Sequence, residues 1–127
     1  MNVVDSSGWL EYFADGPNAD FFAPAIEKTA ELVVPTVSIF EVFKRMRQQI
    51  GDEAALHAVT AMMQGQVVEL DASLALSAAK LSGDLQIPMA DSMILATSQA
   101  FNAELWTQDS DLQGIENVRF VEKRQHR

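Results

Sequence analysis

The chain has 127 residues, 48% hydrophobic and 21% charged, which is typical of one globular domain and excludes disordered and fibrous proteins. No apolar run approaches the roughly 20 residues that span a bilayer, and no signal peptide is recognisable, so we expect a cytoplasmic protein without a membrane partner. The lack of cysteine excludes disulfides and thiolate metal sites. The net charge of −9 argues against a basic nucleic-acid-binding surface, unless several acids converge on a cation that then faces phosphate.

Short strands are predicted to alternate with helices, because apolar runs such as Leu32-Val33-Val34 indicate buried strands and apolar residues at helical spacing indicate helices. In chain order the expected elements are a strand at 2–5, a helix from 6 to the break at Asp15-Gly16-Pro17, a helix or loop at about 18–30, a strand at 32–35, a helix from 36 or 38 to 50, a helix at 53–63, a strand at 66–70, a helix from 71 through 81, a helix at 88–101, and strands at 104–107 and 118–121.

Strands joined by helical segments predict an α/β fold, in which helices cover both faces of a mostly parallel central sheet of about five strands. No repeat, low-complexity segment or long linker divides the chain, so we expect residues 1–127 to form a single domain. Ligands bind such sheets beyond the carboxyl ends of the strands. That rule directs attention to Asp5 and to residues 107–111.

Two acids in this pattern have both a structural and a functional interpretation. Asp5 follows the first strand, where it either caps the next helix or offers an oxygen ligand to a hard cation. Asp91 lies in the first turn of a helix, where the helix dipole favours an acid. Its neighbours Ile94 and Leu95 are apolar, however, and a carboxylate on the inward side of such a helix needs a partner.

Asp109 and Asp111 follow the fourth strand, either as a solvated turn or as acids on the same side of the sheet as Asp5, with the Thr107 hydroxyl beside them. Glu41 is uninformative alone, because Arg45 stands four residues on, at the spacing of a surface ion pair.

Other chemistries find little support. His57 and His126 have no acid, serine or second histidine at ligand spacing, and neither a P-loop nor a GxGxxG run is present. Lys44, Arg45 and Arg47 form a basic cluster that is either a solvated helix face or a contact surface for phosphates.

Four runs follow one another in order and span nearly the whole chain: Val3-Val4-Asp5-Ser6-Ser7, Pro35-Thr36-Val37-Ser38-Ile39-Phe40-Glu41-Val42, Ala90-Asp91-Ser92-Met93-Ile94-Leu95-Ala96-Thr97 and Leu105-Trp106-Thr107-Gln108-Asp109. Together they resemble the PIN domain, and in particular the VapC-type toxins of bacterial toxin–antitoxin pairs. The resemblance implies a PIN-like three-layer sandwich formed by residues 1–127, and an endoribonuclease that leaves 5′-phosphate and 3′-hydroxyl ends.

By position, the family's acidic site maps onto Asp5, Glu41, Asp91 and Asp109, and Asp111 either assists or braces the loop. Clustered carboxylates repel one another, and one or two Mg²⁺ or Mn²⁺ ions would relieve that repulsion. The resemblance also implies an RNA substrate, a homodimer, and a VapB-like antitoxin that covers a hydrophobic groove. Six apolar residues are candidates for that groove or for ordinary core: Trp9, Leu10, Phe13, Phe21, Phe22 and Phe43.

Two rival interpretations stay open at this point. A phosphorylation-receiver domain has a similar size and an acidic Mg²⁺ pocket, and Asp71 follows the third strand as its phosphoacceptor would. It also needs an acidic pair after the first strand, and Asp5 has no acidic neighbour. A PIN-like module that binds without catalysis is the second rival.

Overall fold

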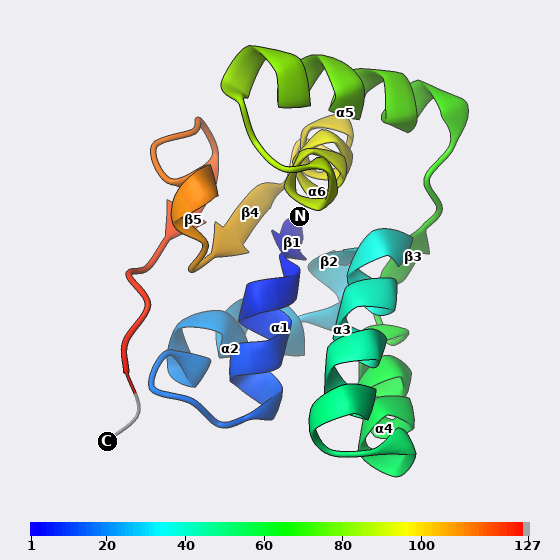
Figure 1. The fold of residues 1–127 in the computed structure, drawn as a ribbon, viewed down its shortest axis with the longest axis vertical. Helices are drawn as coiled ribbons and strands as arrows, with labels where there is room; N and C mark the ends of the chain where they lie inside the picture. Colours follow the sequence, from blue (N-terminus) through cyan, green and yellow to red (C-terminus); the bar gives the residue numbers. More distant parts are fainter. Residues whose placement is uncertain (126–127) are drawn as a thin grey trace.

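A parallel five-stranded sheet runs through the centre of the molecule (Figure 1), in a computed structural model that describes residues 1–125. The strands are β1 (Asn2–Val4), β2 (Leu32–Pro35), β3 (Gln66–Val68), β4 (Glu104–Thr107) and β5 (Val118–Phe120). Their order across the sheet is β3-β2-β1-β4-β5. The chain therefore builds one half of the sheet outward from β1, then returns to the other side of β1 with β4.

Six α-helices surround the sheet: α1 (Ser6–Phe13), α2 (Ala19–Glu27), α3 (Thr36–Gln49), α4 (Asp52–Met62), α5 (Ala72–Leu85) and α6 (Met89–Ala100). Short 3-10 turns lie at Thr29–Glu31 (η1) and Ser110–Leu112 (η2). Within the described residues, no helix has the length and apolarity needed to cross a membrane.

Alternation along the central strands divides the core between the two faces of the sheet. Val4 and Val34 point into a core shared with α1, α2, α3 and α4. Val3 and Val33 point to the opposite face, where Leu95 of α6 packs against them. Successive side chains of a strand alternate between faces, and a run of valines can therefore fill both cores at once. The expected three-layer α/β architecture is confirmed.

The predicted strands are all present, although three are shorter than expected. β1 ends at Val4, because Asp5 caps α1, although its backbone N–H still donates to the Trp106 carbonyl of β4 at 3.1 Å. β3 ends at Val68 and β5 at Phe120, and both are edge strands that pair on one side alone. The uncertain segment at 18–30 is a helix, α2, followed by the turn η1. His126 lies outside the described residues.

The strand order creates a crevice between β1 and β4 at their carboxyl ends. β1 and β4 pair directly, with Val4 opposite Trp106. The connections that leave these two strands run to opposite halves of the sheet, and ligands bind open α/β sheets at such a switch point. Asp5 and Asp109 emerge at this point of the fold.

Candidate metal centre

Asp5 is the most buried acid of the crevice, with 2% of its surface exposed. Its Oδ1 accepts hydrogen bonds from the Gly8 backbone N–H at 3.0 Å and from the Ser7 hydroxyl at 2.7 Å. Its Oδ2 accepts one from the Thr107 hydroxyl at 2.6 Å. Burial raises the pKa of Asp5 to about 6, although these hydrogen bonds lower it, and the charge of Asp109 raises it further. The capping role and the position in the crevice therefore coexist in one residue.

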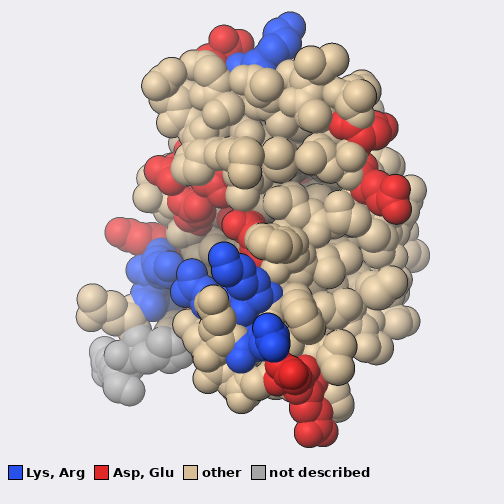
Figure 2. Space-filling model, turned by 45° about the vertical axis from the view of Figure 1, so that its right-hand side comes forward, with Lys and Arg blue, Asp and Glu red and all other residues tan. Residues whose placement is uncertain are grey.

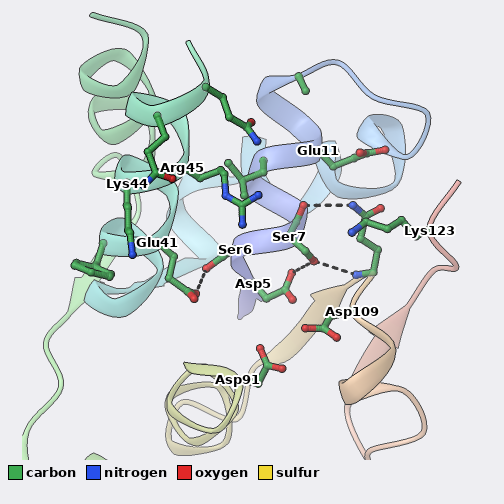
Figure 3. A pocket seen from close by; sticks show the side chains of 16 residues that line it. Asp5, Ser6, Ser7, Glu11, Glu41, Lys44, Arg45, Asp91, Asp109 and Lys123 are labelled. Carbon is green, nitrogen blue, oxygen red and sulfur yellow. Dashed lines mark hydrogen bonds between the residues drawn. The ribbon is translucent and has the colours of Figure 1, made fainter. Parts of the chain in front are cut away.

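Asp91 projects toward Asp5 and Asp109 from the first turn of α6 (Figure 3). The same helix buries Ile94 and Leu95 against the sheet, and that packing fixes the side of α6 on which Asp91 lies. Burial raises the pKa of Asp91 to about 7, and the charge of Asp109, its hydrogen-bonding contact and the charges of Asp5 and Asp111 act in the same direction. Near pH 7 this repulsion is offset by a proton, held by one carboxylate or shared between two, or by a bound cation.

Asp109 and Asp111 are held by the turn that follows β4. The Asp109 backbone N–H donates to the Thr107 hydroxyl at 2.9 Å, and the Asp111 N–H donates to Asp109 Oδ1 at 2.9 Å. Asp91, Asp109 and Asp111 each present an oxygen within 4.8 Å of those of the other two. Three converging carboxylate oxygens are a donor set that suits a hard divalent cation such as Mg²⁺ or Mn²⁺. The residues therefore fit such an ion.

Glu41 reaches the same cavity from α3, on the opposite wall (Figure 3). Its Oε1 accepts a 2.6 Å hydrogen bond from the Ser6 hydroxyl, which fixes the carboxylate beside the start of α1. The surface ion pair with Arg45 is absent from the described residues, whose ion pairs are Arg47–Asp52 and Arg119–Glu104. The structural interpretation of Glu41 is therefore not supported.

The acids line a cavity of about 750 Å³ whose other walls carry cations. The cavity is lined by all four predicted site residues: Asp5, Glu41, Asp91 and Asp109. Asp111 does not line it, but its carboxylate lies close to those of Asp91 and Asp109. The cationic residues of its lining are Lys44, Arg45 and Lys123. Figure 2 shows a gathering of Lys and Arg side chains directly beside acidic ones on one face of this acidic protein.

Part of the predicted basic cluster and part of the predicted groove differ from expectation. Arg47 is ion-paired with Asp52 at 2.7 Å and does not line the cavity. Trp9 and Phe22 are fully buried among the core residues, so neither can line an exposed groove. The remaining candidates are half-buried at the edge of that core: Leu10, Phe13, Phe21 and Phe43.

Two residues that line the cavity are not among the predicted site residues, although Gln108 falls within the run 107–111 that follows the fourth strand. Gln108 lines the cavity and is buried, with its Nε2 donating to the Ser7 carbonyl at 3.5 Å. Lys123 also lines the cavity and lies beyond the last strand, in a part of the sequence with no motif that points to the site. Both reach the site through contacts between residues distant in sequence.

The receiver-domain alternative does not fit this geometry. Asp71 caps α5 by accepting from the Leu74 N–H at 2.8 Å and is exposed. It follows β3, which is an edge strand, whereas the acid cluster lies beside β1 and β4.

Comparisons with known proteins agree with this fold. The sequence matches the PIN domain family over residues 3–118, so the chain belongs to the PIN domain family. No curated protein matches the sequence.

Several solved structures share the fold. A chain of a toxin–antitoxin complex from Klebsiella pneumoniae has a TM-score of 0.77 at 19% identity, with 94% of this chain and 96% of that chain covered. VapC20 of Mycobacterium tuberculosis, described as a toxin that cleaves the sarcin–ricin loop, has a TM-score of 0.77 at 18% identity, with 94% and 99% covered. A chain of VapBC2 from Rickettsia felis, bound to a promoter DNA fragment, has a TM-score of 0.72 at 12% identity, with 95% and 97% covered.

Proposed function

We propose that this protein is a metal-dependent endoribonuclease, formed by residues 1–127 as a single PIN domain, and that it acts as the toxin of a bacterial toxin–antitoxin pair. The observation that carries the proposal is the convergence of Asp91, Asp109 and Asp111 within 4.8 Å, beside the buried Asp5, in a PIN domain. Such a cluster is costly without a cation and well suited to one. A cytoplasmic location follows from the proposal, because the substrate RNA is found there.

In this proposal Asp91, Asp109 and Asp111 would hold Mg²⁺ or Mn²⁺, and the ion would supply water activation and charge stabilisation for phosphodiester hydrolysis. Asp5 supplies fixed negative charge behind them, since three hydrogen bonds hold its carboxylate in place. Glu41 faces the same cavity from α3 and is oriented by Ser6, so it is placed to accept a proton during hydrolysis.

Lys44 and Arg45 belong to the RNA-binding part of the proposal. Both line the cavity from α3, on the same wall as Glu41. Cations beside the acids would attract the phosphates that flank the scissile one, and would offset the net charge of −9 locally.

The proposed protein partner is a VapB-like antitoxin. Structures of similar fold include a toxin–antitoxin complex and a VapBC2 complex on promoter DNA. A homodimer is the proposed assembly, for which the large exposed side chains of Leu76 in α5 and Met89 in α6 offer apolar surface. Light scattering on the purified protein tests it, and a monomer at micromolar concentration would contradict it.

The test of the enzymatic proposal is cleavage of total cellular RNA by purified protein free of antitoxin. We expect cleavage with Mg²⁺ or Mn²⁺ and none with EDTA. Asp91→Asn should lower the rate by about 100-fold or more, since a metal contributes several kcal/mol and each 1.4 kcal/mol is a factor of ten. Asp84→Asn, an exposed acid of α5, is the matched control and should leave the rate unchanged.

The same experiment separates catalysis from the rival in which the module binds RNA without cutting it. Circular dichroism shows whether Asp91→Asn is folded. Retention of cleavage in a folded Asp91→Asn protein would overturn the metal-site assignment, and metal-independent binding without cleavage in the wild type would favour the binding module.

A further inference from the structure

The chain beyond β5 forms part of the wall of the site cavity. We call residues 121–124 the C-terminal segment; it has no regular secondary structure. Its first backbone N–H, that of Val121, donates to the Thr107 carbonyl at 3.0 Å. The Asn18 side chain then binds it twice: Nδ2 donates to the Glu122 carbonyl at 3.0 Å, and Oδ1 accepts from Nε of Arg124 at 2.8 Å. The segment is therefore fixed at both ends.

Asn18 is itself held firmly. It is 1% exposed, its backbone N–H donates to Oε2 of Glu11 at 2.7 Å, and its Nδ2 also donates to Oε1 of Gln108 at 2.9 Å. A buried amide whose donors and acceptor are all in use has one stable orientation. Because Gln108 follows β4 directly, Asn18 connects the C-terminal segment to the strand end that carries Asp109.

Lys123 lies between the two residues that Asn18 fixes, Glu122 and Arg124. Its side chain borders the acidic cavity and also an adjoining hollow of about 520 Å³ that Asp109 and Gln108 line too. Figure 3 shows Lys123 across the cavity from Lys44 and Arg45. Within the described residues Lys123 takes part in no ion pair. Its ammonium group is thus available to an external anion.

The cations are distributed unevenly for so acidic a protein. Arg47 and Arg119 are engaged in ion pairs, and Arg124 is engaged with Asn18. The cavity is lined by Lys44 and Arg45 on one side and by Lys123 on the other. Single-stranded nucleic acids are bound by such positively lined grooves that follow the phosphate backbone.

We infer that the C-terminal segment is a second RNA-binding wall of the site, in which Lys123 contacts a phosphate next to the scissile one and Asn18 is the residue that positions it. The inference deepens the proposed RNA cleavage and rests on it. In this arrangement a single-stranded RNA would pass over the acids, between Lys44 and Arg45 on one side and Lys123 on the other.

The test measures RNA binding separately from cleavage. Fluorescence anisotropy with a labelled 20-nucleotide oligouridine is followed at several KCl concentrations, in the Asp91→Asn background and in EDTA, so that cleavage does not interfere. Lys123→Gln should weaken binding about 3- to 10-fold and reduce the slope of log K against log [salt] by about 0.7, the value of one phosphate contact to a single strand. Lys80→Gln, an exposed lysine of α5, removes the same charge away from the cavity and should leave both quantities unchanged.

The positioning role of Asn18 requires a further comparison. Asn18→Ala should weaken binding as Lys123→Gln does, and the double variant should lose little more than either single variant, because both act on the same contact. Hydrogen exchange at the Val121 amide should accelerate in Asn18→Ala. A variant that ends at Val121 keeps β5 and Asn18 but removes Lys123, and it should lose at least as much affinity as Lys123→Gln.

The outcomes separate this inference from the proposed function. Equal affinity and equal salt dependence for Lys123→Gln and Lys80→Gln would overturn the inference, even if the wild type cleaves RNA. If the protein shows no metal-dependent cleavage but Lys123→Gln still weakens RNA binding, the enzymatic proposal is wrong and the RNA-binding role of Lys123 is supported. Loss of affinity for an acidic peptide, with RNA affinity unchanged, would assign Lys123 to a protein partner and overturn the inference.

Discussion

The hydroxyl of Thr107 donates a 2.6 Å hydrogen bond to Oδ2 of Asp5, and so joins the ends of two neighbouring strands that lie 102 residues apart in sequence. The same hydroxyl accepts the Asp109 backbone N–H at 2.9 Å. One buried side chain therefore sets the position of two predicted site acids relative to each other.

Thr107→Val keeps the shape of the side chain and removes both hydrogen bonds. Asp5 then loses the largest of the contacts that lower its pKa, and a buried acceptor is left without its partner. We expect the free energy of unfolding to fall by about 1–3 kcal/mol and cleavage to fall as well. Urea denaturation and RNA cleavage measure the two effects.

Thr97→Val is the control, because the buried Thr97 hydroxyl donates at 2.9 Å to a carbonyl of its own helix, that of Met93. It should cost less stability and leave cleavage unchanged. Equal cleavage by the two variants would show that Thr107 does not position the acids.

The metal-free protein should lose stability as the pH rises from 6 to 8. The folded pKa values of Asp5 (about 6) and Asp91 (about 7) both lie above the ordinary value of 3.8. The folded state therefore binds protons more tightly, and the contribution of these groups to stability, complete below about pH 4, is lost as the pH rises through 6 and 7. Thermal unfolding in EDTA at the two pH values measures this loss.

Mg²⁺ should reverse this loss of stability, and it should raise the Tm more at pH 8 than at pH 6. At 100 times its Kd a ligand adds about 2.7 kcal/mol, which is on the order of 10 °C for a domain of this size. Asp91→Asn should remove most of both effects. A Tm in EDTA that does not depend on pH between 6 and 8, and that Mg²⁺ leaves unchanged, would be incompatible with a metal site built from these acids.

Glu41 and Ser6 should act as a unit. Glu41→Gln is expected to reduce cleavage by about 100-fold or more, within the range for loss of a general base. Ser6→Ala should reduce it less, because the 2.6 Å hydrogen bond only orients the carboxylate. The double variant should be no slower than Glu41→Gln alone. Ser77→Ala, on the exposed part of α5, is the control. Additive losses would mean that Ser6 acts independently of Glu41.

Two glycine substitutions should change stability in opposite directions. A Cβ on Gly8 would lie 2.6 Å from a Phe22 ring carbon and from a methyl of Val4, both in the core, so Gly8→Ala should destabilise by about 1–3 kcal/mol. Gly83 lies within α5 with nothing within 4 Å, so Gly83→Ala should stabilise by roughly 0.5–1 kcal/mol. Chemical denaturation decides both signs, and a neutral Gly8→Ala would show that α1 can move away from β1.

The elements could be predicted from the sequence because their signals are local. The valine runs of β1 and β2 and the helical spacing of Val42 and Met46 are visible within a few residues. Asp5 and Asp109 could be placed together because parallel strands end at one edge of the sheet. That either acid acts on a metal ion, directly or from behind its ligands, stays a prediction.

Long-range pairing could not be predicted in the same way. Glu41 has Arg45 one helical turn away, yet its partner is Ser6, 35 residues earlier. Trp9 and Phe22 could not be distinguished from groove residues by type, because burial of an aromatic residue depends on which helices pack together. Asn18 and Arg124 are 106 positions apart, and neither residue suggests the other.

The order of the strands also determines when the acidic site can assemble during synthesis. The strand at the centre of the sheet is made first, but its neighbour on one side is not complete until residue 107 has been added. Until then the carboxylate at position 5 has no Thr107 hydroxyl and no Asp109 beside it. On the proposed function, a nascent chain that has not yet reached Asp109 lacks the assembled acids and should not cleave RNA.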